Sequence, residues 1–153
     1  MIVSKNGLDL IKEFESFKSK PYLCPSQIPT IGFGSTYYHD GKKVTLQDKE
    51  ISEQKACEIL EYIANKDFGN NINKVVKVPL NQNQFDALVS FAYNIGNANF
   101  NSSTLLIWLN QGNYKEASIQ LLRWDKAKGI VLNGLTKRRK AEKALFDKAS
   151  KLN

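Results

Sequence analysis

The segment FDALVSFAYNI, residues 85–95, is apolar on most faces of the helix that its spacing predicts. A helix that is apolar nearly all round is normally buried, so we expect this segment to form the centre of a helical lobe. Asn81 and Gln84 have the spacing of a capping box, which would start this helix. Gly96 suits its C-terminus, because glycine tolerates the left-handed backbone needed there.

Further helices are expected on both sides of this central segment. Before it, the apolar spacing predicts a helix over about 51–67 that could continue toward residue 77. After it, the predicted helices are a short one capped by Ser103 or Thr104 and ending at Gly112, and two longer ones at about 113–124 and 136–151.

Residues 20–46 differ from the rest of the chain, because two prolines near their start cannot sit inside a helix. The stretch TIGFGSTYY, residues 30–38, has the β-branched, aromatic and glycine content of a twisted strand. Asp40-Gly41 predicts a hairpin turn, and residues 43–45 are expected to form the returning strand. A sheet this small and polar is not stable alone, so it must pack against the helices.

Together these expectations define an α+β fold that is mostly α. We expect a small N-terminal lobe with a short antiparallel sheet at about residues 1–60, and a larger all-α lobe at about 80–153. A helix at about 52–78 would connect them. The 153 residues and 17.3 kDa fit one domain spanning residues 1–153. A cleft between two such lobes is a common ligand site.

The composition excludes several classes of protein. Hydrophobic residues make up 42% and charged residues 24%, which argues against a disordered chain. Two cysteines are too few for a disulfide scaffold, and one histidine argues against a His-based metal site, so we expect neither metal nor cofactor. Cys57, in the predicted helix over 51–67, is interpreted as a structural thiol, and nothing in the sequence requires a disulfide to Cys24.

The sequence shows no targeting signal. Its start, MIVSKNG, lacks the apolar core of a secretory signal peptide. No stretch approaches the roughly 18 uncharged apolar residues of a membrane span. We therefore expect a product of the cytoplasm without a membrane span, which needs help to cross the membrane if its target lies outside.

Basic residues are concentrated near the C-terminus. Residues 1–122 carry 12 Lys and Arg against 12 Asp and Glu, whereas residues 123–153 carry 10 against 3, which accounts for the net charge of +7. Such a segment suits a polyanion: nucleic acid, an anionic membrane or an acidic wall polymer. The alternative is an ordinary solvated basic helix.

Glu15 lies on the apolar side of a predicted amphipathic helix over residues 7–18. On a helical wheel it falls about 20° from Leu8, inside the apolar arc. A carboxylate there should be partly desolvated, which raises its pKa unless a cation compensates. Cys24 and Thr30 follow at the sheet, so a short loop can bring all three groups around one cleft.

Eight segments, in order over nearly the whole chain, match a known pattern. They are GLDLIKEFE (7–15), PYLCP (21–25), PTIGFG (29–34), QFDALVSFAYNIG (84–96), STLL (103–106), RW (123–124), GL (134–135) and RRKAE (138–142). Together they closely resemble the phage-type lysozymes of glycoside hydrolase family 24. The resemblance implies a lysozyme-like fold and an endolysin that cuts the β-1,4 bond between N-acetylmuramic acid and N-acetylglucosamine in peptidoglycan.

The resemblance also implies partners and a place of action. The enzyme would act on peptidoglycan glycan strands in the periplasm after a holin opens the inner membrane. We further expect a monomer that binds no nucleic acid, since no base-stacking motif accompanies the basic segment.

On this resemblance, Glu15 corresponds to the general acid of the family, and its place on an apolar edge agrees with a proton held near neutral pH. Cys24 stands where many members have Asp and others have Cys. An ionised Cys24 could orient or deprotonate water, or stabilise positive charge on the sugar; otherwise Thr30 and Glu15 could position the water. The alternatives are a small buried filler for Cys24 and a strand-forming role alone for Thr30.

Other positions are candidates for substrate binding. Asn94 could bind an N-acetyl group or the catalytic Glu, or could cap its own helix. Arg138 or Arg139 could reach Glu15 or acidic groups of the glycan, and the spacing does not decide which. Family members usually have His where this chain has Ser35, so an imidazole that could pair with an acid is missing.

Three functional hypotheses remain open from the sequence. The first is a muramidase that uses Glu15 as acid and a water near Cys24 and Thr30. The second is a lytic transglycosylase, which needs no second carboxylate and forms 1,6-anhydro products. The third is a non-catalytic protein that binds the wall, or nucleic acid, through its basic segment.

Overall fold

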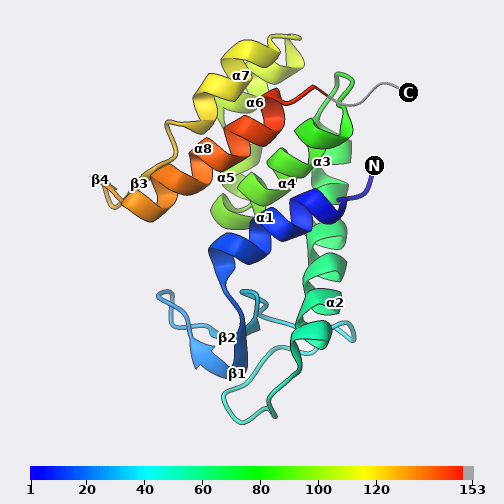
Figure 1. The fold of residues 1–153 in the computed structure, drawn as a ribbon, viewed down its shortest axis with the longest axis vertical. Coiled ribbons are helices and arrows are strands. Elements are labelled where there is room, and N and C mark those ends of the chain that lie inside the picture. The colour runs from blue at the N-terminus through cyan, green and yellow to red at the C-terminus, as the bar shows by residue number, and fades with distance from the viewer. Residues whose placement is uncertain (150–153) are drawn as a thin grey trace.

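The computed structural model describes residues 1–149, whose elements form two lobes (Figure 1). The smaller lobe holds β1 (Lys18–Leu23) and β2 (Pro29–Gly32). The connection is α2 (Glu53–Ile63), the π-helical turn η1 (Ala64–Gly69) and α3 (Asn70–Val75). The other elements are α1 (Lys5–Glu15), α4 (Gln82–Ile95), α5 (Asn97–Asn101), α6 (Thr104–Asn110), α7 (Tyr114–Leu121), β3 (Lys126–Ala127), β4 (Ile130–Val131) and α8 (Asn133–Asp147).

The α+β, mostly helical architecture is confirmed, but the small sheet differs from the prediction. β1 pairs with β2 in antiparallel fashion, with Tyr22 opposite Thr30. The expected strand over residues 30–38 ends at Gly32, and beyond it only isolated bridges join Ile31 to Ser35 and Tyr37 to Lys43. The returning strand predicted over 43–45 is therefore reduced to one bridge.

β1 had no counterpart in the sequence-based prediction, because proline is usually absent from strands. Pro21 lies within β1, which has one partner strand and a register irregularity between Lys18 and Tyr22. An edge strand with such an irregularity tolerates a missing backbone donor. The turn at Asp40-Gly41 is present, and Gly41 has a φ of +83°.

The central helix forms as predicted. The side chain of Asn81 accepts a hydrogen bond from the Gln84 backbone, and the Gln84 side chain accepts one from the Asn81 backbone, so the capping box is complete. Every residue from Phe85 to Ala92 is buried. Gly96 ends α4 with a φ of +88°. Ser103 caps α6, which is one of the two predicted alternatives.

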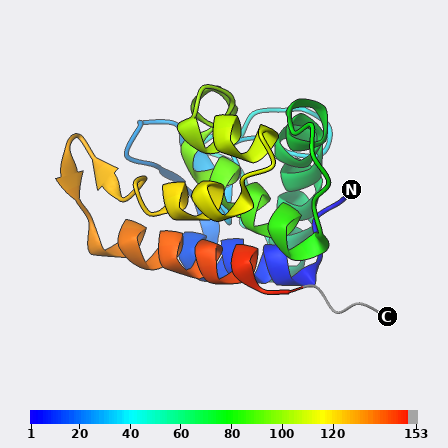
Figure 2. The same cartoon turned by 90° about the horizontal axis from the view of Figure 1, so that it is seen from above.

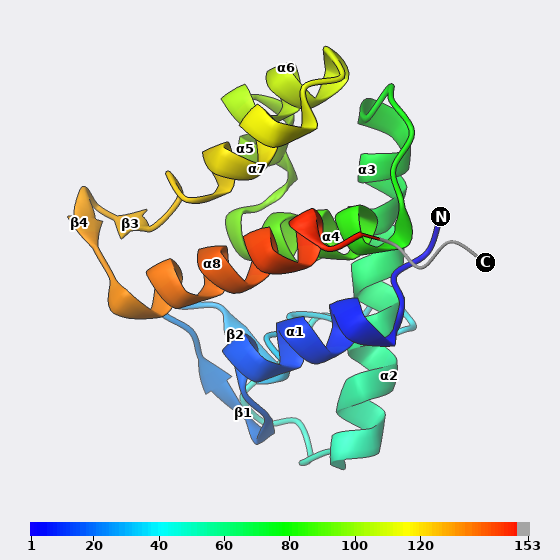
Figure 3. The ribbon, with the colours of Figure 1, turned by 45° about the horizontal axis from the view of Figure 1, so that its top comes forward.

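α1 packs with the helical lobe, whereas the sequence-based boundary near residue 60 places it in the smaller lobe. α1 contacts α4 and α8, and the three helices lie side by side (Figures 1 and 3). The buried Asp86 of α4 accepts hydrogen bonds from the backbone and the hydroxyl of Ser4, which anchors the start of α1. α1 ends at Glu15, and the chain enters β1 of the sheet at Lys18.

Two short features were not predicted: α5, and the hairpin of β3 and β4. Figure 2 shows this hairpin projecting beyond one end of α8. α8 itself begins at Asn133 and ends at Asp147, while the predicted end at residue 151 lies outside the described residues. Within residues 1–149, no helix has the length and apolar character needed to cross a membrane.

Candidate active site

Glu15 is the last residue of α1, at the place where the chain leaves the helical lobe for the sheet. Ser16 follows it with a φ of +58°, a left-handed conformation that ends the helix. The Glu15 side chain is 21% exposed, and its Oε2 accepts a hydrogen bond of 2.5 Å from Nη1 of Arg138. The expected half-buried carboxylate is present, together with a compensating cation.

Each of the three nitrogens of the Arg138 guanidinium group donates a hydrogen bond. Besides Glu15, its Nε donates to Oε2 of Glu142 at 3.2 Å, and its Nη2 donates to the carbonyl of Ser90 at 3.0 Å. The Arg138 side chain is only 4% exposed. The structure thus decides between the two arginines: Arg138 contacts Glu15.

Arg139 points elsewhere and is completely buried. Its Nη2 donates to Oδ1 of Asn94 at 2.8 Å, and its Nε lies 2.8 Å from Oε1 of Glu142. Burial lowers the pKa of Arg139 to about 10 and raises that of Glu142. The expectation that Arg139 contacts substrate is corrected here, because its guanidinium reaches other side chains and no open surface.

Asn94 and Glu15 line the same hollow, of about 370 Å³. Its walls come from the ends of α1 and α4 and from the start of α8: Phe14, Glu15, Asn94, Leu132, Gly134, Leu135 and Arg138. Asn94 is exposed, and its side-chain oxygen is already held by Arg139. Its amide nitrogen can therefore face a ligand.

On the other side of Glu15, the loop after β2 passes close to the acid. A Cβ atom added to Gly34 would lie 2.9 Å from Oε1 of Glu15, and Gly34 has a φ of +82°. Tyr93 of α4 donates from its hydroxyl to the carbonyl of Phe33 at 2.7 Å, which ties this loop to the helical lobe. Burial, followed by the charge of Glu15, raises the pKa of Tyr93.

Gly34 and Tyr93 also line a second, smaller hollow of about 210 Å³, together with Ser35, Tyr37 and Asp67. Glu15 thus lines one hollow, and Gly34, which lies beside its Oε1, lines the other. Within this hollow, Asp67 accepts a hydrogen bond from the Tyr37 hydroxyl. Burial and this bond raise the pKa of Tyr37.

Cys24 and Thr30 meet at the loop that joins β1 to β2. The backbone of Ile28, then the hydroxyl of Thr30, lower the pKa of the partly exposed Cys24 thiol by hydrogen bonding. Thr30 is buried, and its hydroxyl donates to the Ile28 carbonyl at 2.8 Å. Burial raises the pKa of Tyr22, and the charges of Glu15 and Cys24 raise it further, which places Tyr22 within electrostatic reach of both groups.

The second cysteine is separate from this site. Cys57 is half-buried and packs against the core, and both cysteines are free. Nζ of Lys12 lies 3.9 Å from the Cys57 sulfur.

Sequence reasoning missed Gly34, Tyr93 and Glu142. The sequence carries a signal for two of these residues, Tyr93 and Glu142. Tyr93 directly precedes Asn94 at the end of a buried helix, and Glu142 follows Arg138 by four residues, the spacing at which helical side chains meet. The closeness of Gly34 to Glu15 is a tertiary contact and has no sequence signal.

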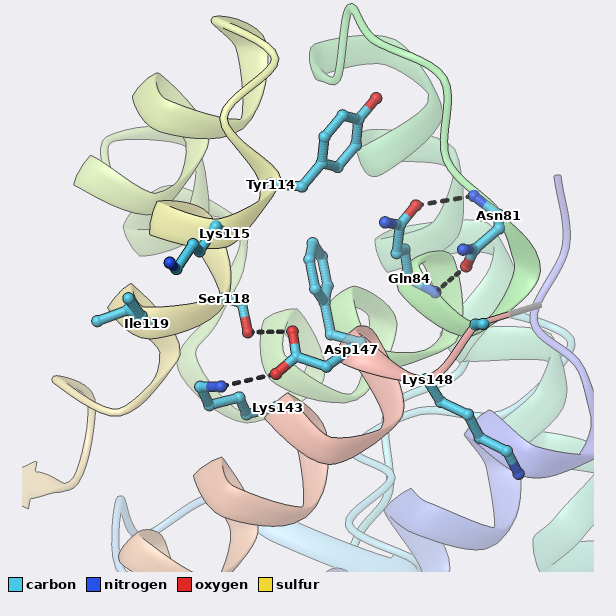
Figure 4. Close-up of a pocket in the computed structure, with 11 residues that line it drawn as sticks. Asn81, Gln84, Tyr114, Lys115, Ser118, Ile119, Lys143, Asp147 and Lys148 are labelled. Atoms are coloured by element: carbon cyan, nitrogen blue, oxygen red, sulfur yellow. Dashed lines mark hydrogen bonds and ion pairs between the residues drawn. The ribbon is translucent and has the colours of Figure 1, made fainter.

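A larger recess, of about 510 Å³, lies away from these residues (Figure 4). It is bordered by the start of α4, by α7 and by the end of α8. Its carboxylate, Asp147, is already bonded to Ser118 at 2.5 Å and to Lys143 at 2.6 Å. None of the predicted site residues lines it, so it is not the candidate active site.

Comparison with known proteins identifies the family of the chain. The family model described as Phage lysozyme matches residues 12–142. The chain is 43% identical over 148 residues to the endolysin of Bacillus phage B103, covering 95% of this chain and 54% of that relative. It therefore spans about half the length of that curated relative.

Solved structures match over nearly their full length. The endolysin from Escherichia coli O157:H7 phage FAHEc1 superposes with a TM-score of 0.85 at 37% identity, covering 96% of this chain and 94% of that one. The muramidase domain of SpmX from Asticaccaulis excentricus superposes with a TM-score of 0.83 at 32% identity, covering 96% and 98%.

Proposed function

Because the chain belongs to the phage lysozyme family, we propose that it is an endolysin, an N-acetylmuramidase that hydrolyses the β-1,4 bond between N-acetylmuramic acid and N-acetylglucosamine in peptidoglycan. One observation carries the proposal. The half-buried carboxylate of Glu15 lies where the two lobes meet, lines a hollow and is held by Arg138.

Glu15 is the general acid of this reaction. Its Oε2 is bonded to Arg138, whereas Oε1 lies beside Gly34, where the lack of a Cβ keeps a side chain off the oxygen. Oε1 therefore delivers the proton to the glycosidic oxygen as the bond to the anomeric carbon breaks. The positive charge that develops on the sugar requires a nucleophile or a negative group on its other side.

Cys24 is the better candidate for that second group. Its thiol is partly exposed and its pKa is lowered, whereas the Thr30 hydroxyl is buried and bonded to a backbone carbonyl. A thiolate can orient or deprotonate the attacking water. In this scheme Thr30 supports Cys24, and Asn94 offers its amide to an N-acetyl group of the substrate.

The proposal extends to the setting in which the enzyme works. The enzyme acts as a monomer on wall glycan strands in the periplasm, and a holin gives it passage from the cytoplasm. The support is that two of the three named similar proteins are endolysins. Expression in a bacterial host with and without a co-expressed holin tests this: lysis is expected only with the holin, and lysis without it would refute the requirement.

The reaction itself is tested by mass spectrometry of the fragments released from purified peptidoglycan. Hydrolysis gives muropeptides with a reducing-end N-acetylmuramic acid. Products with 1,6-anhydro ends would instead identify a lytic transglycosylase, for which the absence of a second carboxylate is the specific argument. Binding without release of any fragment would indicate a non-catalytic wall-binding protein.

A further inference from the structure

We infer that Glu142 is a positioning residue for the reaction, because its buried carboxylate holds the guanidinium of Arg138 in the one orientation that presents it to Glu15. The inference rests on the proposed function of Glu15 as the acid. Glu142 lies behind Arg138 and is completely buried, so it acts through its neighbour and not on substrate.

The geometry fixes Arg138 on every side. Glu142 accepts from Nε, the Ser90 carbonyl accepts from Nη2, and Glu15 accepts from Nη1. Since the guanidinium is planar, two bonds on the buried side determine where the third nitrogen points. The hydroxyl of Ser90 donates to Glu142 at 2.6 Å, so the carboxylate is itself held by α4.

Burying the charged groups of this network costs desolvation free energy. Glu142 and Arg139 are both fully buried, and burial shifts the pKa of each toward its neutral form. Buried ion pairs are often replaceable by apolar side chains with no loss of stability. One end of this network reaches the hollow, where Arg138 bonds Glu15.

The charges also alternate along the network. Glu15 is followed by Arg138, then Glu142, then Arg139. Removing the charge of Glu142 leaves two neighbouring guanidinium groups without the counter-ion that they share. Arg138 would then be held on its buried side by the Ser90 carbonyl alone, and its guanidinium would shift relative to Glu15. The other titratable groups that face Glu15 are Tyr93 from α4 and Tyr22 from β1, and both remain in place.

The test compares Glu142→Gln with wild type on soluble, uncrosslinked glycan strands. We expect kcat to fall at least about tenfold with KM within about twofold, because a small displacement of a catalytic group lowers the rate of the chemical step. Glu142→Asp keeps the charge and should recover part of the lost kcat, with KM again within about twofold.

Leu109→Ala is the matched control for lost stability, because Leu109 is fully buried in α6, away from the network. Rates are compared per folded molecule, well below each unfolding midpoint. The inference is overturned if Glu142→Gln keeps kcat within about twofold of wild type, or if its kcat falls only as far as that of Leu109→Ala.

Three further outcomes keep the test decisive. Should Glu142→Gln not fold, Glu142→Asp decides: a wild-type kcat in that variant contradicts the inference. If Glu15→Gln retains full activity, the proposed function fails whatever Glu142 does. If Glu15→Gln is inactive while Glu142→Gln is fully active, only the present inference fails.

Discussion

At Glu15, the two carboxylate oxygens have different surroundings, and this difference defines the acid. One oxygen is bonded to Arg138 and the other faces the backbone of Gly34. The place of Glu15 on an apolar arc was predictable, because helical periodicity alone determines it. The choice between Arg138 and Arg139 was not predictable, because neighbouring helix positions point about 100° apart and only the packing of α8 on α1 and α4 decides which one faces Glu15.

Arg138→Gln should be strongly destabilising. It leaves Glu142 without one of its partners and Glu15 without a cation, in a region where Arg138 is 4% exposed. Breaking a buried pair by removing one partner typically costs about 3 kcal/mol or more of unfolding free energy. Urea unfolding measures this loss of unfolding free energy. Arg123→Gln is the control, because Arg123 is exposed and its substitution is expected to be neutral. Equal unfolding midpoints for the two variants would refute the structural role given to Arg138.

Cys24 should ionise at a lower pH than an ordinary thiol, because the Ile28 backbone stabilises its thiolate, as does the Thr30 hydroxyl once its proton turns from the Ile28 carbonyl to the sulfur. Iodoacetamide alkylation followed against pH in a Cys57→Ser background gives the midpoint. Thr30→Val should move the midpoint upward, since one hydrogen bond is lost, while Thr30→Ser should leave it close to that of the parent. A midpoint equal to that of the urea-unfolded chain would contradict a lowered pKa.

At the scale of elements, long and strongly periodic segments were predictable and short ones were not. α4, its capping box and its terminal glycine followed from local rules, because each involves contacts within four residues. β1, α5 and the hairpin of β3 and β4 are short, and each depends on partners elsewhere in the chain. The approach of the loop after β2 to the end of α1, which completes the site, is of the same kind.

The loop after β2 offers a test of that approach. Gly34→Ala and Gly41→Ala both place a Cβ at a positive φ, of +82° and +83°. Each should cost about 1–2 kcal/mol of unfolding free energy from backbone strain. Only the Cβ at Gly34 would meet Glu15, since nothing lies within 4 Å of the one at Gly41. Peptidoglycan hydrolysis per folded molecule should therefore fall for Gly34→Ala alone, and equal activities would argue against this close approach.

At the scale of the whole molecule, the site joins parts of the chain that are far apart in sequence. Glu15 ends α1, Arg138 belongs to α8, and the loop carrying Gly34 follows the sheet. The basic C-terminal segment is more mixed than its composition suggested, because Arg138 and Arg139 are buried and paired, whereas lysines such as Lys126 and Lys128 are exposed. The part of the positive excess that faces solvent is thus smaller than the sequence count.

Retention on purified sacculi should weaken as salt rises, because exposed charge contacts are screened beyond about 10 Å at 0.1 M salt. A pelleting assay over about 0.05–0.5 M NaCl measures it. Gln substitutions at Lys126 and Lys128 together should reduce the salt dependence more than the same pair of changes at Lys42 and Lys43, which are exposed in the smaller lobe. Retention that is independent of salt would exclude an electrostatic role for the basic segment.

The most direct measurement compares Glu15→Gln with Glu13→Gln in a turbidity assay on outer-membrane-permeabilised bacteria. Both changes remove one carboxylate from α1 and keep its shape, but Glu13 is exposed whereas Glu15 is bonded to Arg138 in the hollow. We predict that Glu13→Gln lyses the cells at the wild-type rate and that Glu15→Gln, folded and still able to bind sacculi, does not. Lysis by Glu15→Gln at the wild-type rate would contradict the assignment of the acid.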